Sequence, residues 1–373
     1  MPEVAVLILA PAPDPDAGPL ARLLDDARAG LAEHHRRAFL AAGAATVLVR
    51  REPPDDTPFG ARLRRLASEV LGDGRPAGLV ILGAGSIPLA SAADQRALVE
   101  AAAARTPGAL VNQRYSADVL AIARADLVLA GLPAGLDSDN ALPRWLAEGA
   151  GIGVRDLRAR RRLAMDVDSP LDLLLLEGAS GAPSLPLPDD DAASAVWSRL
   201  AALRTLAGDP GAELLVAGRM SSADLRWMER STRSRTRAWI EERGLRTAAA
   251  GALVGRPNRR PPRSLLGELL DRDGAGSLGR LLATMADGAI VDTRVLLAHR
   301  LGAAEDAWPP AEDRFASDLL LADRVRDPWL AALTSAAADA PIPVLLGGHG
   351  LTGPGARFAL RGRRAAVAGG RSR

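Results

Sequence analysis

Apolar runs of strand length alternate with longer stretches of helical periodicity through the first half of this chain. Residues 4–9 form a continuous apolar run, and apolar side chains then recur at helical spacing over residues 20–43. Strand-type runs follow at 45–50 and 78–82, with a helical stretch at 61–71 between them. A β-α-β-α order of this kind predicts an α/β fold, with a mainly parallel sheet covered by helices on both faces.

The same alternation continues to about residue 177. Ser91 is a good N-cap for a helix that runs through Ala104, because Asp94 follows it at the spacing of a capping box. His34 and His35 fall on what the pattern predicts to be the solvated surface of the first helix. Three strands and one helix are expected in the remainder, the strands at 109–112, 119–123 and 163–167 and the helix at 141–149.

A chain of 373 residues exceeds what one hydrophobic core usually supports, so we expect two domains. Residues 179–193 are rich in Gly, Pro, Ser and Asp, which is typical of a linker. The expected organisation is a first domain over 1–178, this linker, a second α/β domain over 194–362 and a frayed tail over 363–373. In the second domain we expect strands at 213–217, 289–297 and 342–346, and helices at 222–244 and 265–286, the latter broken near Gly274.

The charge balance and the absence of cysteine exclude several classes of function. All 47 basic residues are arginine, and they nearly balance the 45 acidic ones, so the formal net charge is only +2. That balance does not indicate nucleic-acid binding, which would need the arginines gathered on one face. No apolar run approaches the roughly 20 residues that cross a bilayer. Without cysteine there is no disulfide, thiolate metal site or thiol nucleophile. We therefore expect a cytoplasmic protein without a membrane or nucleic-acid partner.

Two candidate segments follow strand-type runs. Gly83-Ala84-Gly85-Ser86-Ile87-Pro88-Leu89 comes after the run at 78–82 and leads into the helix capped by Ser91. Asn112 and Arg114 follow another run, where an amide and a guanidinium at the carboxyl edge of a sheet can bind a phosphate or a sugar hydroxyl. Read locally, the first segment is a tight turn with a helix cap, and the second is an ordinary polar turn.

A third segment, Asp137-Ser138-Asp139-Asn140, comes directly before a predicted helix. Its acceptor groups lie beside a helix N-terminus, where backbone N–H groups suit an anion. The same residues are also good helix caps, and both readings remain open.

The most specific motif is Met165-Asp166-Val167-Asp168-Ser169-Pro170-Leu171-Asp172. Alternation along a strand places Asp166 and Asp168 on the same side, so the two carboxylates could share a cation or a substrate. A purely structural passage from strand to helix is the alternative, because Ser169 and Pro170 suit the start of a helix.

Taken in order, these segments resemble the nucleotidyltransferase domain of the phospholactate and molybdenum-cofactor guanylyltransferases, over residues 1–178. The resemblance implies a sheet of the GT-A type (nucleotide-diphospho-sugar transferase-like), a nucleotide or phosphorylated small molecule as ligand, and a role in cofactor biosynthesis. It also implies Mg²⁺ held by the catalytic carboxylates of Asp166 and Asp168. The candidate substrate contacts are Ser86, Asn112, Arg114, Asp137, Asp139 and Asn140, of which the resemblance itself implies those of the turn at 137–140.

Two positions depart from the resembled pattern. The family has a metal-binding Asp where this chain has Ser86, and a neutral hydroxyl is a poor Mg²⁺ ligand. The loop after the first strand is Gly-rich or basic in the family, whereas residues 10–19 here contain Asp14 and Asp16 and no base. We therefore expect nucleotidyl transfer to be weak or absent.

A competing hypothesis makes the first domain a non-catalytic binding or assembly module and places any chemistry in the second. The turn Gly347-Gly348-His349-Gly350 follows an apolar run, where glycines allow a ligand to approach the backbone. A single His is more often structural than catalytic, so a catalytic His349 remains one of two readings. The candidate residues of this domain are Asp292, Arg294, Asp318 and His349.

Overall fold

The computed structural model describes residues 2–53, 57–72, 77–115, 117–136, 138–243, 245 and 261–361. Residues cluster into two compact units. The first contains Met1–Asp168 and Gly181–Pro186, and the second contains Ser169–Ser180 and Leu187–Arg373. The tail expected to fray, 363–373, lies outside the described residues.

The first unit is built on a six-stranded sheet with the order β2-β1-β3-β5-β4-β6. Only β5 runs antiparallel to its neighbours β3 and β4, and every other pair is parallel. The strands are β1 (Val4–Pro11), β2 (Thr46–Glu52), β3 (Gly78–Gly83), β4 (Gly108–Val111), β5 (Val119–Ala123) and β6 (Val154–Asp156). The helices are α1 (Pro19–Ala41), α2 (Phe59–Leu71), α3 (Ala92–Ala102), α4 (Ala125–Val128) and α5 (Leu142–Glu148), with short 3-10 turns η1 (Leu129–Gly131), η2 (Asp139–Ala141) and η3 (Arg161–Ala164).

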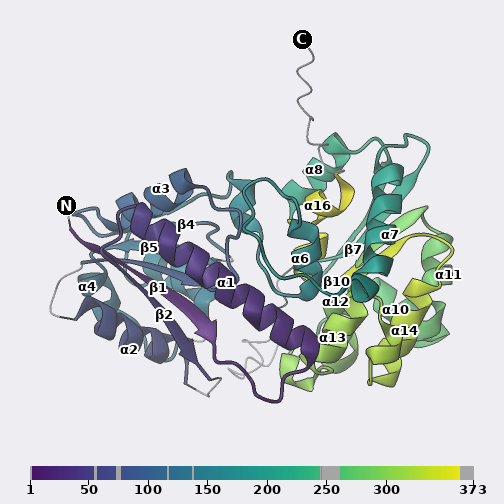
Figure 1. Ribbon diagram of the computed structural model, residues 1–373, viewed down its shortest axis with the longest axis horizontal. Coiled ribbons are helices and arrows are strands. Elements are labelled where there is room, and N and C mark those ends of the chain that lie inside the picture. Colours follow the sequence, from purple (N-terminus) through teal and green to yellow (C-terminus); the bar gives the residue numbers. More distant parts are fainter. Residues whose placement is uncertain are drawn as a thin grey trace, which may run out of the picture. The chain divides into compact units, whose positions relative to one another are not determined.

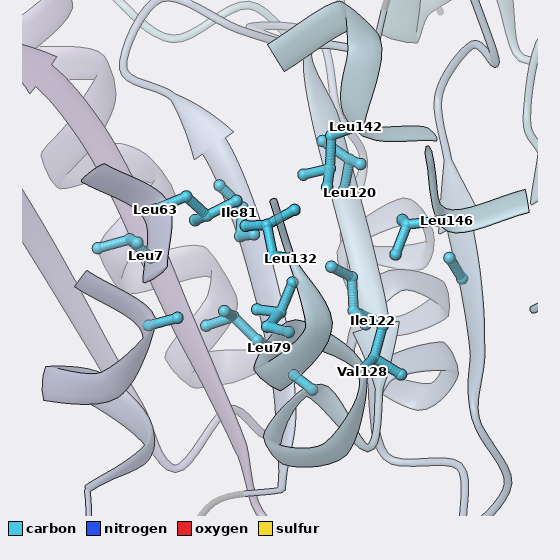
Figure 2. Packing of buried hydrophobic residues seen from close by; sticks show 14 of the residues in the cluster. Leu7, Leu63, Leu79, Ile81, Leu120, Ile122, Val128, Leu132, Leu142 and Leu146 are labelled. Atoms are coloured by element: carbon cyan, nitrogen blue, oxygen red, sulfur yellow. The ribbon is translucent and has the colours of Figure 1, made fainter. Parts of the chain in front are cut away.

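Both faces of this sheet are covered by helices, as the sequence predicts. Alternate residues of β1 point to opposite sides: Val4, Val6 and Ile8 join one apolar cluster, and Ala5 and Leu7 join another. Helices α1 and α3 cover the first side, and α2 and α4 cover the second (Figure 1). Leu142 and Leu146 of α5 join the second cluster as well. Figure 2 shows the second cluster, in which leucines of α2 and α5 pack on side chains of β1, β3 and β5. The expected α/β fold is confirmed.

The second unit contains a four-stranded, fully parallel sheet with the order β10-β9-β7-β8. Its strands are β7 (Glu213–Gly218), β8 (Arg235–Ile240), β9 (Gly288–Asp292) and β10 (Val344–Gly347). The helices before β9 are α6 (Pro170–Leu176), α7 (Asp190–Ala207), α8 (Ser222–Ser231), α10 (Leu265–Asp273) and α11 (Leu278–Ala283), with the turn η4 (Ala275–Ser277). Those after β9 are α12 (Thr293–Leu301), α13 (Ala311–Asp318), α14 (Pro328–Ala338), α15 (His349–Thr352) and α16 (Ala356–Leu360), with η5 (Glu305–Ala307) and η6 (Ala322–Arg324). The second half is thus also α/β.

Three expected elements differ from the structure. The helix expected at 222–244 ends at Ser231 and is followed by β8, an edge strand whose charged residues Arg235 and Arg237 hid its period of two. The strand expected at 289–297 ends at Asp292, and the apolar residues after it belong to α12. The strand expected at 163–167 is a 3-10 turn followed by one isolated bridge, in which Asp166 pairs with Ser86 of the turn after β3.

The residues directly after Asp168 belong to a different unit from the one that the sequence predicts. Helix α6, which the sequence places in the first domain, belongs to the second unit, and Gly181–Pro186 belongs to the first. The five leucines of α6 are all buried. Burial of this apolar surface is sufficient reason for α6 to be part of a core.

Candidate functional site

The motif at the end of β3 and the Asp166–Asp168 motif lie next to each other in the first unit. Ser86 and Asp166 form an antiparallel bridge, and the backbone N–H of Val167 donates to the carbonyl of Gly85 at 2.9 Å. A Cβ at Gly85 would lie 2.7 Å from the carbonyl oxygen of Val167, so glycine is needed for this approach. Two segments 80 residues apart in the sequence, Ser86 and Asp166, thus meet at the carboxyl edge of the sheet.

Arg28 of α1 supplies a positive charge at this edge. Its Nε donates to the carbonyl of Val167 at 3.0 Å, and its Nη2 donates to Oδ1 of Asp168 at 3.3 Å. Asp168 is more exposed than Arg28, with 55% of its side chain accessible against 24%. Sequence reasoning missed Arg28, although it lies between Leu24 and Leu31 on the buried stripe of α1, where a charged residue is unusual.

His35 holds the same turn through a hydrogen bond to Ser86. The expectation that His35 is solvated is wrong. It is fully buried, and its Nε2 donates to the carbonyl of Ser86 at 2.8 Å. Since a carbonyl only accepts, the proton is on Nε2, and Nδ1 finds no hydrogen-bond partner among the described residues. Burial lowers the pKa of His35 from 6.5 to about 4, so the imidazole is neutral at pH 7.

Asp94 fixes the segment that leads into Asp166. It forms the expected capping box with Ser91, and its buried carboxylate also accepts hydrogen bonds from Arg160 at 2.8 Å and from Arg162 at 2.6 and 2.7 Å. Burial opposes ionisation of Asp94, but the guanidinium of Arg162 and the other donors lower its pKa to about 2. The carboxylate therefore stays charged and holds residues 160–162 against α3.

The other predicted contacts of this unit are placed as follows. The amide of Asn112 is fully used inside the protein: it donates to Asp118 and to the carbonyl of Leu163, and accepts from two backbone N–H groups. Arg114 is half-buried on the turn after β4. Asp139 is exposed and accepts a hydrogen bond from the backbone of Asn140, and Asp137 lies outside the described residues.

Asp139 and Asn140 are not brought to Asp166 by any contact described above. They lead into α5, whose leucines pack with the α2 side of the sheet, whereas Leu163 packs with the α1 side. A binding site shared by the turn and the carboxylate pair stays a prediction.

The residues present do not fit a divalent cation at this edge. No group of three or more His, Asp or Glu side chains in the described part of the chain is arranged to hold a metal ion. The charge of Asp168 is balanced by Arg28, and Ser86 stands where the resembled family has a carboxylate. Mg²⁺ prefers several carboxylate and water oxygens in octahedral geometry, and an arginine in contact with one of two carboxylates works against that.

In the second unit, the four predicted candidates lie together at the carboxyl edge of the parallel sheet. Asp292 ends β9 and accepts two hydrogen bonds from Arg219, at 2.6 and 3.1 Å, from the end of β7. Arg294 donates through both terminal nitrogens to the carboxylate of Asp318, through Nη2 at 2.7 Å. Burial opposes the charge on Asp292, but Arg219 overcomes it and lowers the pKa of Asp292. Sequence reasoning missed Arg219.

His349 completes this edge. Its Nδ1 lies 3.1 Å from the carbonyl oxygen of Arg219, which only accepts, so Nδ1 carries the proton and Nε2 is the basic nitrogen of the neutral ring. The side chain is exposed, unlike those of Asp292 and Asp318. His299 is instead buried between a backbone N–H and Asp271, so both of its nitrogens are used.

No protein-family model matches the sequence, and no curated protein matches it. Among solved structures, the chain is similar to a proposed nucleotide-diphospho-sugar transferase from Desulfovibrio desulfuricans G20. The match has 14% identity and a TM-score of 0.32, and it covers 48% of this chain and 88% of the other. At these values the likeness does not bear on activity. No helix in the described part of the chain is long and apolar enough to span a membrane.

Proposed function

We propose that the first unit binds a nucleotide or a phosphorylated small molecule at the carboxyl edge of its sheet, and that it does so without metal-dependent nucleotidyl transfer. The observation that supports this is the position of Arg28, whose guanidinium contacts both Val167 and Asp168. Arg28 is a cation at the place where the resembled domains use a metal ion to hold phosphates.

The chemistry of the edge suits the phosphate and the sugar of a nucleotide. Two of the nitrogens of Arg28 are used by Val167 and Asp168, and Nη1 has no hydrogen bond to a described residue, so it can donate to a phosphate oxygen. The exposed carboxylate of Asp168 can accept a hydrogen bond from a sugar hydroxyl. The neutral His35 holds the turn at Ser86 through a hydrogen bond. The ion pairs of Asp94 with Arg160 and Arg162 hold the residues that precede Asp166.

Thermal denaturation with nucleoside triphosphates, in Mg²⁺ and in EDTA, tests this proposal. A ligand that binds only the native state at 100 times its Kd stabilises it by about 2.7 kcal/mol, so binding raises the melting temperature. We expect the increase in both buffers, and we expect it to be much smaller in Arg28→Gln. Arg36→Gln is the control, because Arg36 lies on the same helix and pairs only with the exposed Glu33.

Pyrophosphate release separates binding from catalysis. We expect no release above background with Mg²⁺ and candidate phosphorylated acceptors. Binding that requires Mg²⁺, together with turnover that disappears in Asp168→Asn, would contradict the proposal and restore the nucleotidyltransferase reading.

A further inference from the structure

The order of strands in the second unit places a topological switch point between β7 and β9. From β7 the chain proceeds to β8 in one direction along the sheet, and from β9 it proceeds to β10 in the opposite direction. In open parallel sheets, ligands bind outside the carboxyl ends of the two strands at such a point. Here those ends lead into Arg219 and Asp292, which are hydrogen-bonded to each other.

The charged groups at this point are arranged with the acids inside and the bases outside. The side chains of Asp292 and Asp318 are 0% exposed, whereas those of Arg219 and Arg294 are 13% and 12% exposed. Asp172, the third carboxylate nearby, is also buried and caps α6. A molecule that approaches from solvent therefore meets guanidinium groups rather than carboxylates.

The two guanidinium groups are held in fixed orientations with donor capacity remaining. Arg219 uses Nε and Nη2 on Asp292, and its Nη1 has no hydrogen bond to any residue in the described ranges. Arg294 uses its two terminal nitrogens on Asp318 and Thr293. Buried carboxylates that fix two arginines remove most of the ordering cost that a ligand would otherwise have to overcome.

The turn after β10 leaves these arginines accessible. A Cβ at Gly348 would lie 3.5 Å from Nε of Arg294, in ordinary contact, and φ at Gly348 is −103°, which any residue adopts. The glycine is therefore not required by the backbone, and a side chain at this position would lie against the guanidinium of Arg294. His349, next in sequence, presents an exposed imidazole whose Nδ1 is anchored on Arg219.

We infer that the second unit carries an oxyanion site, formed by Arg219, Arg294 and His349 at the switch point, which binds the phosphate or carboxylate group of a small molecule. It is independent of the nucleotide site proposed for the first unit. The guanidinium groups supply charge-assisted donors, and the exposed ring of His349 lies beside Arg219.

Chemical modification of His349 tests this inference on the full-length protein. Diethyl pyrocarbonate acylates unprotonated imidazole, and mass spectrometry of a digest gives the rate at each histidine. We expect inorganic phosphate at ten times its Kd to slow modification of His349 by about elevenfold, by simple occupancy. His34, half-buried on α1 of the first unit, is the internal control and should keep its rate. A parallel series with acetate tells whether phosphate or carboxylate is preferred.

Gly348→Ala places a methyl group beside Arg294, and we expect it to raise the Kd for phosphate about tenfold, the loss of one charge-assisted hydrogen bond. At the same phosphate concentration, the protection of His349 then falls from about elevenfold to about twofold. Gly276→Ala is the matched control, because nothing lies within 4 Å of a Cβ there. Equal protection in both variants, or an unchanged rate at His349 in either anion, would overturn the inference. Nucleotide binding by the first unit would leave the His349 rate unaffected, so the two proposals fail separately.

Discussion

The buried His35 should make the stability of the first unit depend on pH between about 4 and 6.5. Its pKa is about 4 in the folded protein and 6.5 in an exposed imidazole. Between these values the unfolded chain binds a proton that the folded protein does not, so stability decreases as the pH falls from 6.5 towards 4. Above pH 6.5 the contribution is fully present.

The size of the effect follows from the two pKa values. At pH 5 the unfolded imidazole is almost fully protonated and the folded one is mostly neutral, which costs about 2 kcal/mol of stability relative to pH 8. Solvent does not weaken this effect, because His35 is 0% exposed. A loss of this size is a large part of the free energy of unfolding of a typical domain, about 5–15 kcal/mol.

Hydrogen–deuterium exchange of peptides from β1 and β3, at pH 7.5 and 5.0, measures this change for the first unit alone. In His35→Gln the donor to Ser86 is kept but the titration is lost, so the difference between the two pH values should shrink by about 2 kcal/mol. His34→Gln is the comparison: burial also lowers the pKa of His34, but less than that of His35, so this variant should lose a smaller part of the pH dependence. Equal pH dependence in wild type and His35→Gln would refute the reasoning.

Two further changes test the packing of each candidate site. Gly85→Ala places a Cβ 2.7 Å from the backbone oxygen of Val167 and should destabilise the first unit by about 1–3 kcal/mol, as measured by the same hydrogen exchange. Gly131→Ala is the control and should leave the stability unchanged, because nothing lies within 4 Å of a Cβ there. Asp292→Asn leaves Arg219 without its buried counter-charge and should cost about 3–5 kcal/mol in urea unfolding, against less than about 1 kcal/mol for Asp273→Asn, whose partner Arg272 is exposed. An Asp292→Asn loss no larger than that of Asp273→Asn would show that the pair is not energetically important.

The sequence predicts the fold class because a strand that is buried on both faces consists of a continuous run of apolar residues. Residues 4–9 and 78–82 have no competing reading, and both are strands. It fails where apolar residues resume soon after a boundary: Val291 belongs to β9 and Val295 to α12, and only three polar residues, at 292–294, separate them. Edge strand β8 was missed because one-sided pairing does not require a strongly apolar sequence.

The sequence identifies candidate site residues better than it identifies their partners. Ser86 and Asp292 are candidates because hydroxyls and acids at or after the end of a strand are local signals, and their roles in a site stay predictions. Arg28, Arg219 and His35 act through contacts with residues far away in the chain. Only Arg28 has a local signal, its place on the buried stripe of α1. Asn112 is an example of a residue that looks like a ligand contact in the sequence but is used inside the protein, where it bonds Asp118 and nearby backbone groups.

The path of the chain through Asp168 and Ser169 limits how this protein can be divided. The chain leaves the first unit after Asp168, forms α6 in the second, returns to the first at Gly181–Pro186 and leaves again at Leu187. A gene fragment that stops at 168 lacks a segment of the first unit. One that stops at 186 carries α6 without its core, and so exposes Leu171, Leu173 and three further leucines to water. No single cut yields two complete units, and during synthesis the first remains unfinished until its last segment, Gly181–Pro186, has emerged.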